Sequence, residues 1–264
     1  MRPESDLVDL AVALADAAGA VVRRYFQTGL DADDKADESP VTVADREAEA
    51  VMRALLAERA PGDGIIGEEH GRERTDAEYV WVLDPIDGTK AFLTGKPLFG
   101  TLVGLLHHGV PVLGIIDQPI LGDRWLGVEG RPTLRNGRPV RVRACAGLGQ
   151  ARLSTTGPQY FTAAERALFD GLGARVKLLS YGGDCYQYGL VASGSLDLVV
   201  ESGLKLHDFA ALVPVITGAG GVITDWQGRP LDVRSTGSVV AAGDARVHAA
   251  AIEALVEGPF PLTT

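Results

Sequence analysis

Asp84 and Asp87 are two carboxylates that follow an apolar run at residues 81–83. Trp, Val and Leu in that run are typical of a buried strand, which predicts that the strand ends at Asp84. Pro85 fixes its own φ and holds Asp84 extended, so we expect the backbone to swing there and bring Asp87 to the same mouth. Like charges about 4 Å apart repel by roughly 4 kcal/mol at an effective dielectric of about 20, and a bound divalent cation removes this cost.

The donor atoms around these carboxylates predict a hard cation. Residues 81–89 contain no Cys or His, and oxygen ligands, among them the free carbonyl of Ile86, favour Mg²⁺ or Mn²⁺ over Zn²⁺. Gly88 lets another group approach the backbone, and Thr89 opens a short helix whose unpaired N–H groups can seat a phosphate. The alternative is an ordinary turn, because Asp-Pro and Asp-Gly are common turn pairs.

Further acids stand at the ends of other predicted elements. Glu68 and Glu69 follow a short apolar strand at residues 64–67. Asp45 fits a capping box at the start of a helix, and Asp208 lies at the start of another. Surface acids and helix caps explain all four on their chemistry alone.

The string Asp-Pro-Ile-Asp-Gly-Thr at residues 84–89 resembles the signature of the inositol monophosphatase family, the Mg²⁺-dependent, lithium-sensitive phosphomonoesterases. The match extends from about residue 7 to residue 255. In one motif the chain departs from the family, which normally has Trp-Asp-x-Ala, because His207 stands in the place of the Trp. The segments that carry the resemblance are residues 41–45, 66–69, 84–89, 207–210 and 218–225.

This resemblance implies a metal site and a water nucleophile. Asp45 and Thr89 would orient the attacking water, and Glu69 would help handle it as a third catalytic residue. No Cys or Ser stands in an activated-nucleophile motif, which agrees with direct attack by water. Two or three Mg²⁺ ions are implied, with Mn²⁺ as a substitute. The implied metal ligands are Glu68, Asp84, the Ile86 carbonyl, Asp87 and Asp208.

A leaving-group pocket is implied at residues 181–186, which follow a predicted strand and open a helix. Asp184 alone fits a helix N-cap. As part of the pocket, facing Glu201, it would instead make the pocket anionic and favour a leaving group that carries an amine over a bisphosphate. The polar segment 31–40 is either a solvated linker or a lid whose cation is Lys35. The expected substrate-binding residues are Lys35, Gly88, Thr89, Gly183, Asp184, Cys185, Glu201 and Asp208.

Residues 182–186 and 207–214 resemble the histidinol-phosphate phosphatase branch of the family. Histidinol carries an ammonium and an imidazole, which carboxylates can bind by charge-assisted hydrogen bonds. The sequence therefore predicts Mg²⁺-dependent hydrolysis of L-histidinol phosphate to L-histidinol and phosphate, a step of histidine biosynthesis, by metal-activated water. The alternatives are an inositol-1-monophosphatase, a broad small-molecule phosphatase of the same family, or a non-enzymatic module that binds metal and a phosphorylated ligand.

The elements expected to position these residues form two halves. An amphipathic helix at residues 7–22 and a series of strands, including residues 140–145, place residues 1–149 in an α+β half with the main metal motifs. Alternating strands and helices place residues 150–264 in an α/β half with the leaving-group pocket and the last metal ligand. The resemblance implies an α+β fold, a layered α-β-α-β-α sandwich of the inositol monophosphatase and fructose bisphosphatase type, commonly assembled as a homodimer.

Composition narrows the classes of partner. The chain has 264 residues, of which 46% are hydrophobic, enough for a large core. Its net charge of −10 argues against nucleic acid or an anionic membrane as the main partner, and the arginines near residues 131–143 fit a solvated hairpin. Two cysteines are too few for a disulfide framework, and no signal peptide or membrane span is recognisable, so the cytoplasm is expected. His107 and His108 have no partner at ligand spacing.

Overall fold

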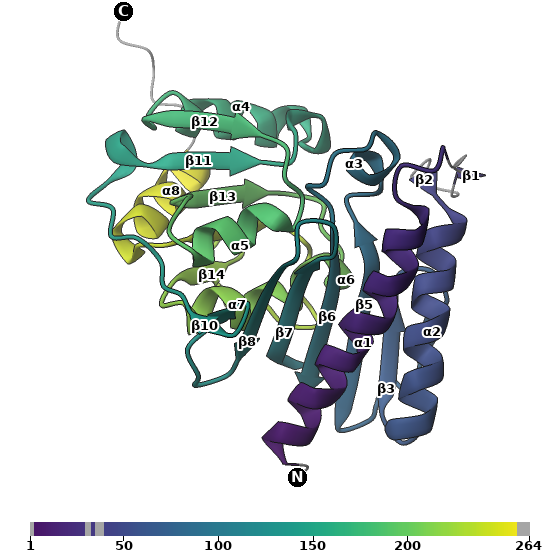
Figure 1. Ribbon diagram of the computed structural model, residues 1–264. Coiled ribbons are helices and arrows are strands. Elements are labelled where there is room, and N and C mark those ends of the chain that lie inside the picture. Colours follow the sequence, from purple (N-terminus) through teal and green to yellow (C-terminus); the bar gives the residue numbers. More distant parts are fainter. Residues whose placement is uncertain (1–2, 30–32, 35–39, 258–264) are drawn as a thin grey trace, which may run out of the picture.

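Five layers of helices and sheets stack in the computed structural model, which describes residues 3–29, 33–34 and 40–257 (Figure 1). An eight-stranded and a five-stranded sheet each carry helices on both faces, with one group of helices between the sheets. The predicted α-β-α-β-α sandwich is confirmed. Lys35 lies outside the described residues. Of the predicted lid, the structure describes only the pairing of β1 (Asp33–Asp34) with β2 (Pro40–Val41).

The first layer consists of α1 (Glu4–Tyr25) and α2 (Val43–Arg59), which run side by side over the eight-stranded sheet (Figure 1). Apolar residues at helical spacing in α1 are buried against this sheet, as the sequence predicts. The Thr42 side chain caps α2 and Asp45 completes a capping box, so α2 begins where the sequence predicts.

The eight-stranded sheet has the order β10-β9-β8-β7-β6-β5-β3-β4 and is antiparallel except for the parallel pair β3 and β5. Asn136 and Gly137 both have positive φ in the tight turn between β9 and β10, as the hairpin signal predicts. The strands are β3 (Gly64–Gly67), β4 (Gly71–Glu73), β5 (Tyr79–Asp87), β6 (Gly100–His107), β7 (Val110–Gln118), β8 (Asp123–Val128), β9 (Leu134–Arg135) and β10 (Arg138–Pro139).

The middle layer contains α5 (Tyr186–Ala192), α6 (Leu206–Phe209) and α7 (Leu212–Gly218). Two glycines let the start of α7 lie directly on the sheet. A Cβ at Gly114 of β7 would lie 1.9 Å from the carbonyl oxygen of Ala211, and a Cβ at Gly127 of β8 would lie 2.3 Å from the carbonyl carbon of Pro214. This close contact fixes the backbone that follows Asp208.

The five-stranded sheet has the order β12-β11-β13-β15-β14, with β11, β12 and β13 parallel. Its outer face is covered by α4 (Ala163–Gly173) and α8 (Ala245–Glu257), which enclose a separate cluster of apolar side chains (Figure 1). The strands are β11 (Arg152–Thr155), β12 (Leu178–Tyr181), β13 (Leu198–Glu201), β14 (Val222–Thr224) and β15 (Val239–Ala242).

The strand predicted at residues 140–145 is absent from the described structure. Its backbone N–H groups donate to scattered acceptors and not to a ladder. Val140 donates to the Thr133 carbonyl at 2.9 Å, Val142 to the Ala219 carbonyl at 3.1 Å, and Cys145 to the Asp244 carboxylate at 3.0 Å. The segment is an extended link between the two sheets.

All strands of the eight-stranded sheet precede residue 140, and all strands of the five-stranded sheet follow residue 151. The proposed halves, residues 1–149 and 150–264, divide the chain between these two sets of strands. Cys145 and Cys185 are both free and buried. Within the described ranges, the helices are too short or too polar to cross a membrane.

Candidate active site

A β-bulge in β5 brings Asp84 and Asp87 to one edge of the eight-stranded sheet. The prediction that the strand ends at Asp84 is wrong, because β5 continues to Asp87. Asp84 faces Leu102 and Asp87 faces Gly100 on β6, so two residues of β5 oppose one residue of β6. Pro85 has no N–H for the ladder, and its carbonyl accepts the Thr101 hydroxyl at 2.8 Å. The bulge therefore produces the change of direction that the sequence assigned to a strand end.

The parallel pairing of β3 and β5 adds a third acid. Gly67 at the end of β3 lies opposite Leu83, and the N–H of Glu68 donates to the Leu83 carbonyl at 3.2 Å. Since parallel strands end at the same edge, Glu68 reaches the region of Asp84. Asp208, from α6, reaches it from the other half of the chain.

Two overlapping groups of donor atoms meet at this edge. Asp84, Asp87 and Asp208 each offer one carboxylate oxygen, and these oxygens lie within 4.8 Å of one another. A second group consists of one donor atom each from Glu68, Asp84 and His207, and these atoms also lie within 4.8 Å of one another. The structure thus brings together the four side chains predicted as metal ligands and adds His207.

Burial and mutual repulsion make these carboxylates costly without a cation. Burial raises the pKa of Asp84 well above its usual range, and the charges of Glu68, Asp87 and Asp208 raise it further. Burial also raises the pKa of Asp87, with Asp184 and Asp208 as the next causes. Hard carboxylate oxygens at such spacing fit Mg²⁺ or Mn²⁺.

The Ile86 backbone lies within the same turn. Its N–H donates to Asp84 Oδ1 at 3.1 Å, and its carbonyl oxygen lies 3.3 Å from Thr89 Oγ1. Coordination by the Ile86 carbonyl remains a prediction.

Asp45 both caps a helix and contacts Thr89. Its Oδ2 accepts the Thr42 N–H at 2.9 Å in the capping box, and its Oδ1 lies 3.5 Å from Thr89 Oγ1, at the long limit for a hydrogen bond. Burial raises the pKa of Asp45, although the Thr42 hydrogen bonds oppose this. The two interpretations of Asp45 from sequence are therefore compatible.

Glu69 follows Glu68, but it is not among the residues that line the adjoining pocket. Its N–H donates to Glu49 Oε2 at 2.6 Å, and the His70 N–H donates to Glu49 Oε1 at 3.1 Å. A Cβ at Gly67 would meet Glu49 Oε1 at 2.0 Å. Glu49, which the sequence analysis missed, is a buried acid that interrupts the apolar face of α2, and it anchors the turn that presents Glu68.

Gly88 joins the metal edge to α3 (Thr89–Leu93). It adopts a left-handed conformation with φ of 91°, and a Cβ there would lie 2.7 Å from the Asp184 carboxyl carbon. Only glycine fits at this position. Gly88 and Thr89 both line the pocket, as the substrate-binding prediction requires.

The pocket beside these residues has a volume of about 230 Å³ and is lined by both halves of the chain. Asp184 lines it and is not the N-cap of α5, because α5 begins after Cys185 and has no side-chain cap. Burial raises the pKa of Asp184 to about 7, and the charge of Glu201 is the next cause. The alternative interpretation of Asp184 as a cap is therefore wrong.

Glu201 is a buried acid that lines the same pocket. It accepts the Thr156 N–H at 3.0 Å and the Tyr188 hydroxyl at 2.8 Å, and burial raises its pKa. The N–H of Cys185, another lining residue, donates to Asp87 Oδ2 at 2.5 Å. Gly183 is not among the lining residues and shapes the segment through its φ of 121°.

Lys90 and Tyr160 at the pocket were missed by sequence reasoning. Lys90 Nζ donates to the Tyr160 hydroxyl at 3.1 Å and lies 5.0 Å from the centroid of its ring. Lys90 directly follows the central motif, so its position was a usable signal. Tyr160 comes from the other half, and its spacing along the chain gives no such signal.

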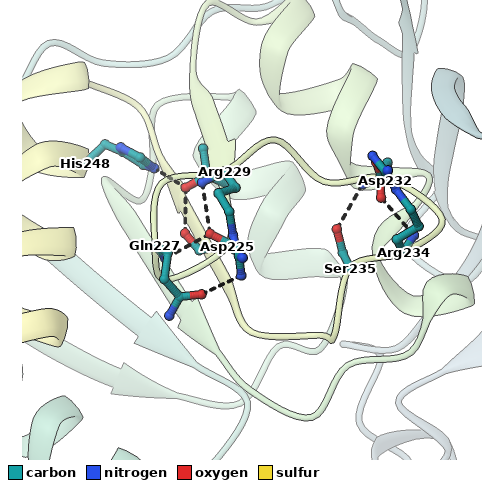
Figure 2. Close-up of polar contacts among 8 residues, drawn as sticks. Asp225, Gln227, Arg229, Asp232, Arg234, Ser235 and His248 are labelled. Atoms are coloured by element: carbon teal, nitrogen blue, oxygen red, sulfur yellow. Dashed lines mark hydrogen bonds and ion pairs between the residues drawn. The ribbon is translucent and has the colours of Figure 1, made fainter.

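The loop between β14 and β15 supports the segment that precedes Asp208. Figure 2 shows its internal contacts: Asp225 accepts N–H groups from Gln227 at 2.8 Å and from Arg229 at 2.9 Å. The same loop contacts the segment after β13, because the Gly237 carbonyl accepts the Leu204 N–H at 3.0 Å. Trp226 Nε1 donates to the carbonyl of Glu201 at 3.0 Å. The ends of β13 and of this loop are thus tied together.

Comparisons with known proteins identify the family of this chain. The family model described as the inositol monophosphatase family matches residues 4–259. The bifunctional phosphatase IMPL2, chloroplastic, of Arabidopsis thaliana is 51% identical over 252 residues, which cover 92% of this chain and 73% of that protein. A histidinol-phosphatase of Chlorobaculum parvum is 35% identical over 236 residues, covering 89% of this chain and 91% of that protein.

A solved structure of an inositol monophosphatase from Zymomonas mobilis has a TM-score of 0.90 to this structure. It is 49% identical in sequence, and the match covers 97% of this chain and 100% of that chain. The family match, the similar sequences and the shared fold all agree. The chain therefore belongs to the inositol monophosphatase family and is a phosphatase.

Proposed function

We propose that this phosphatase hydrolyses L-histidinol phosphate to L-histidinol and phosphate in a Mg²⁺-dependent reaction. The observation that carries the proposal is the convergence of Asp84, Asp87 and Asp208 within 4.8 Å, beside a pocket whose other wall is acidic. The first feature supports phosphate chemistry with a divalent cation. The second supports a leaving group that carries positive charge.

Glu68, Asp84, Asp87 and Asp208 would hold the cations, with the Ile86 carbonyl as a further ligand. Bound Mg²⁺ would neutralise charge on the phosphoryl oxygens and make water more acidic. The N–H groups of Gly88 and Thr89 would bind the phosphate.

The water nucleophile is assigned to Thr89 and Asp45. The Thr89 hydroxyl has one proton and two acceptors in reach, Asp45 Oδ1 at 3.5 Å and the Ile86 carbonyl at 3.3 Å. While it donates to either, its oxygen lone pairs can accept an O–H of the attacking water and orient it. Glu69 and Lys35 keep their proposed roles in handling this water and in closing the site.

Substrate choice is assigned to the wall formed by Asp184 and Glu201. Both line the pocket, Asp184 half-buried and Glu201 buried, and the charge of Glu201 adds to burial in raising the pKa of Asp184. An ammonium or a protonated imidazole would relieve this repulsion, whereas a neutral polyol would not. The histidinol-phosphatase relative supports this substrate, while the inositol monophosphatase from Zymomonas mobilis supports inositol phosphate as the alternative.

A phosphate-release screen tests the proposal. Purified protein is incubated with L-histidinol phosphate, inositol 1-phosphate, fructose 1,6-bisphosphate and a simple alkyl phosphate, each with Mg²⁺ and with chelator. We expect release that depends on Mg²⁺ and is fastest with L-histidinol phosphate. Stoichiometric binding of the phosphoesters without release would favour the non-enzymatic binding module.

The resemblance carries further proposals. Mn²⁺ should replace Mg²⁺, and Li⁺ should inhibit at concentrations where Na⁺ does not, because the sequence resembles the lithium-sensitive phosphomonoesterases. We propose a homodimer in the cytoplasm whose main partner is neither nucleic acid nor a membrane. Inhibition curves in LiCl and NaCl, and light scattering of the purified protein, test the cation response and the assembly.

A further inference from the structure

His207 brings a nitrogen donor to a site otherwise built from oxygen atoms. One of its donor atoms lies within 4.8 Å of donor atoms from both Glu68 and Asp84. Its Nε2 lies 3.4 Å from Asp208 Oδ1, and its side chain, 12% exposed, lines the pocket. Three of the four acidic side chains assigned to the metals therefore adjoin this imidazole.

The local structure explains why His207 and Asp208 both face the site. Asp208 Oδ2 accepts the Lys205 N–H at 2.7 Å, so one oxygen is used in capping α6. Its other oxygen faces His207. The side chains of neighbouring helix residues normally point in different directions. Those of His207 and Asp208 nevertheless contact each other in the first turn of α6.

An ion pair with Asp208 alone is the simpler explanation for His207. That pair requires one acid, whereas the structure surrounds the imidazole with Glu68 and Asp84 as well. A neutral imidazole has one nitrogen lone pair, which is attracted to a cation held by those carboxylates. In the motif that this segment resembles, a Trp normally precedes the Asp and cannot bind a metal, whereas His207 can.

We propose that His207 is a metal ligand through an imidazole nitrogen, and that together with Glu68 and Asp84 it forms a mixed nitrogen and oxygen subsite. The inference rests on the proposed metal-dependent function and adds to it a preference among cations. Imidazole binds later first-row transition metals better than Mg²⁺, whereas carboxylates bind Mg²⁺ well. His207 therefore strengthens binding of Mn²⁺ and Co²⁺ much more than binding of Mg²⁺.

A second group of side chains could also bind Mn²⁺ through histidine, and it must be removed before coordination by His207 is tested. Glu78, His107 and His108 also offer donor atoms within 4.8 Å of one another, with His107 Nε2 3.1 Å from Glu78 Oε1. This corrects the expectation that the two histidines have no partner. The group lies at the end of β5 and β6 opposite the bulge, so His107→Ala and His108→Ala can be introduced together as a background that leaves the active site untouched.

The test is pulsed EPR of Mn²⁺ bound to the metal-stripped background protein, compared with the same protein carrying His207→Gln. The proposal predicts a directly coordinated ¹⁴N signal that His207→Gln removes. It also predicts that the Mn²⁺ Kd rises by about 10-fold while the Mg²⁺ Kd changes little. Labelling histidine with ¹⁵N must replace the ¹⁴N coupling by a ¹⁵N coupling in the background protein that keeps His207. His70, His207 and His248 remain in that background, and of these the described part of the structure groups only His207 with acidic donor atoms within 4.8 Å, so this readout does not depend on how well His207→Gln folds.

The measurements distinguish a wrong assignment of His207 from a wrong assignment of the whole metal site. Mn²⁺ bound without nitrogen coupling, or with coupling that survives His207→Gln, overturns the His207 assignment and leaves the carboxylate site intact. Asp84→Asn in the same background tests whether the metal site itself is correctly assigned. If Mn²⁺ binds equally well with and without Asp84→Asn, the metal site itself is wrong, and the proposed function fails with it.

Discussion

Asp84 is 1% exposed and is surrounded by other acids, so its charge serves cation binding at a cost to the fold. Asp84→Asn should lower turnover by more than about 100-fold, since a metal ligand contributes several kcal/mol to the transition state. The same change should raise the unfolding temperature in chelator, because it removes a buried charge from a repulsive group. Steady-state kinetics with Mg²⁺ and thermal unfolding with chelator measure the two effects. Full activity in the variant would contradict the assignment of this carboxylate.

Asp184 gives a prediction about selectivity. Asp184→Asn keeps the size of the side chain but removes its negative charge from the pocket wall. We expect kcat/KM for L-histidinol phosphate to fall by about 10-fold or more, as for a lost charge-assisted hydrogen bond, with a smaller effect on inositol 1-phosphate. Asp170→Asn, an exposed acid paired with Arg166 on α4, is the matched control and should change neither substrate. An equal loss for both substrates would mean that Asp184 does not select the leaving group.

At this scale local chemistry pointed to Asp84 and Asp87 as a pair of carboxylates beside a proline, whereas Glu68 and Asp208 were singled out as ligands only by the family resemblance. Local chemistry could not decide between a cap and a functional contact for Asp45, since the structure uses both carboxylate oxygens. The contact of Lys90 with Tyr160 could not be predicted, because the two residues meet only through the packing of the two halves.

At the scale of elements, the sequence identified β5 but not its bulge. Pro85 after Asp84 indicates that the backbone changes direction there. Both a strand end and a bulge would produce such a change. The pairing with β6, which continues to Asp87, decides for the bulge. Residues 140–145 show the opposite error. Alternating Val and Arg side chains are typical of a strand, but the neighbouring chain offers isolated acceptors and no ladder.

The packing of α7 on the sheet gives a prediction about an element. Gly114→Ala places a methyl group 1.9 Å from the Ala211 carbonyl oxygen, three residues after Asp208. Overpacking of this kind costs about 1–3 kcal/mol, which should lower the unfolding temperature by roughly 2–12 °C. Because Asp208 moves with this backbone, the Mg²⁺ concentration needed for half-maximal activity should rise.

Gly62→Ala is the control for this change, because a Cβ there has no neighbour within 4 Å. It should alter neither the unfolding temperature nor the Mg²⁺ requirement. If Gly114→Ala behaved like Gly62→Ala, the close contact between β7 and the start of α7 would not exist in solution.

For the whole molecule, the family motifs predicted the layered fold. Hydrophobic periodicity located most of its helices and strands, since both outer helix layers and both sheets have apolar faces that must be covered. The order of the strands and the position of the middle helices depend on long-range contacts, such as those at Gly114 and Gly127, that no local pattern specifies.

Stability of the second half should depend on pH through His248 of α8. The His248 Nε2 lies 2.8 Å from Thr224 Oγ1, and the Thr224 hydroxyl donates to the Asp225 carbonyl at 2.8 Å. The imidazole is therefore the donor to Thr224 in its neutral form. Burial lowers the pKa of His248 below its usual 6.5, so the unfolded chain binds the proton first as the pH falls. Stability should be insensitive to this group above about pH 6.5 and should decline below it.

Urea unfolding of the wild type and of His248→Gln at pH 7.5 and pH 5.5 measures this effect. The wild type should lose more stability between the two pH values than the variant, which has no titrating group at this position. Equal losses in both proteins would show that His248 does not contribute to the pH dependence.

The central claim is that an acidic pocket beside a divalent-metal site selects a phosphomonoester with a cationic leaving group. The most direct measurement is competition between equal concentrations of L-histidinol phosphate and inositol 1-phosphate in one Mg²⁺-containing reaction. Following both substrates by ³¹P NMR gives the ratio of their kcat/KM values without separate assays. The account predicts that L-histidinol phosphate is consumed first and that chelator stops both reactions. Preferential consumption of inositol 1-phosphate, or hydrolysis that continues in chelator, would contradict it.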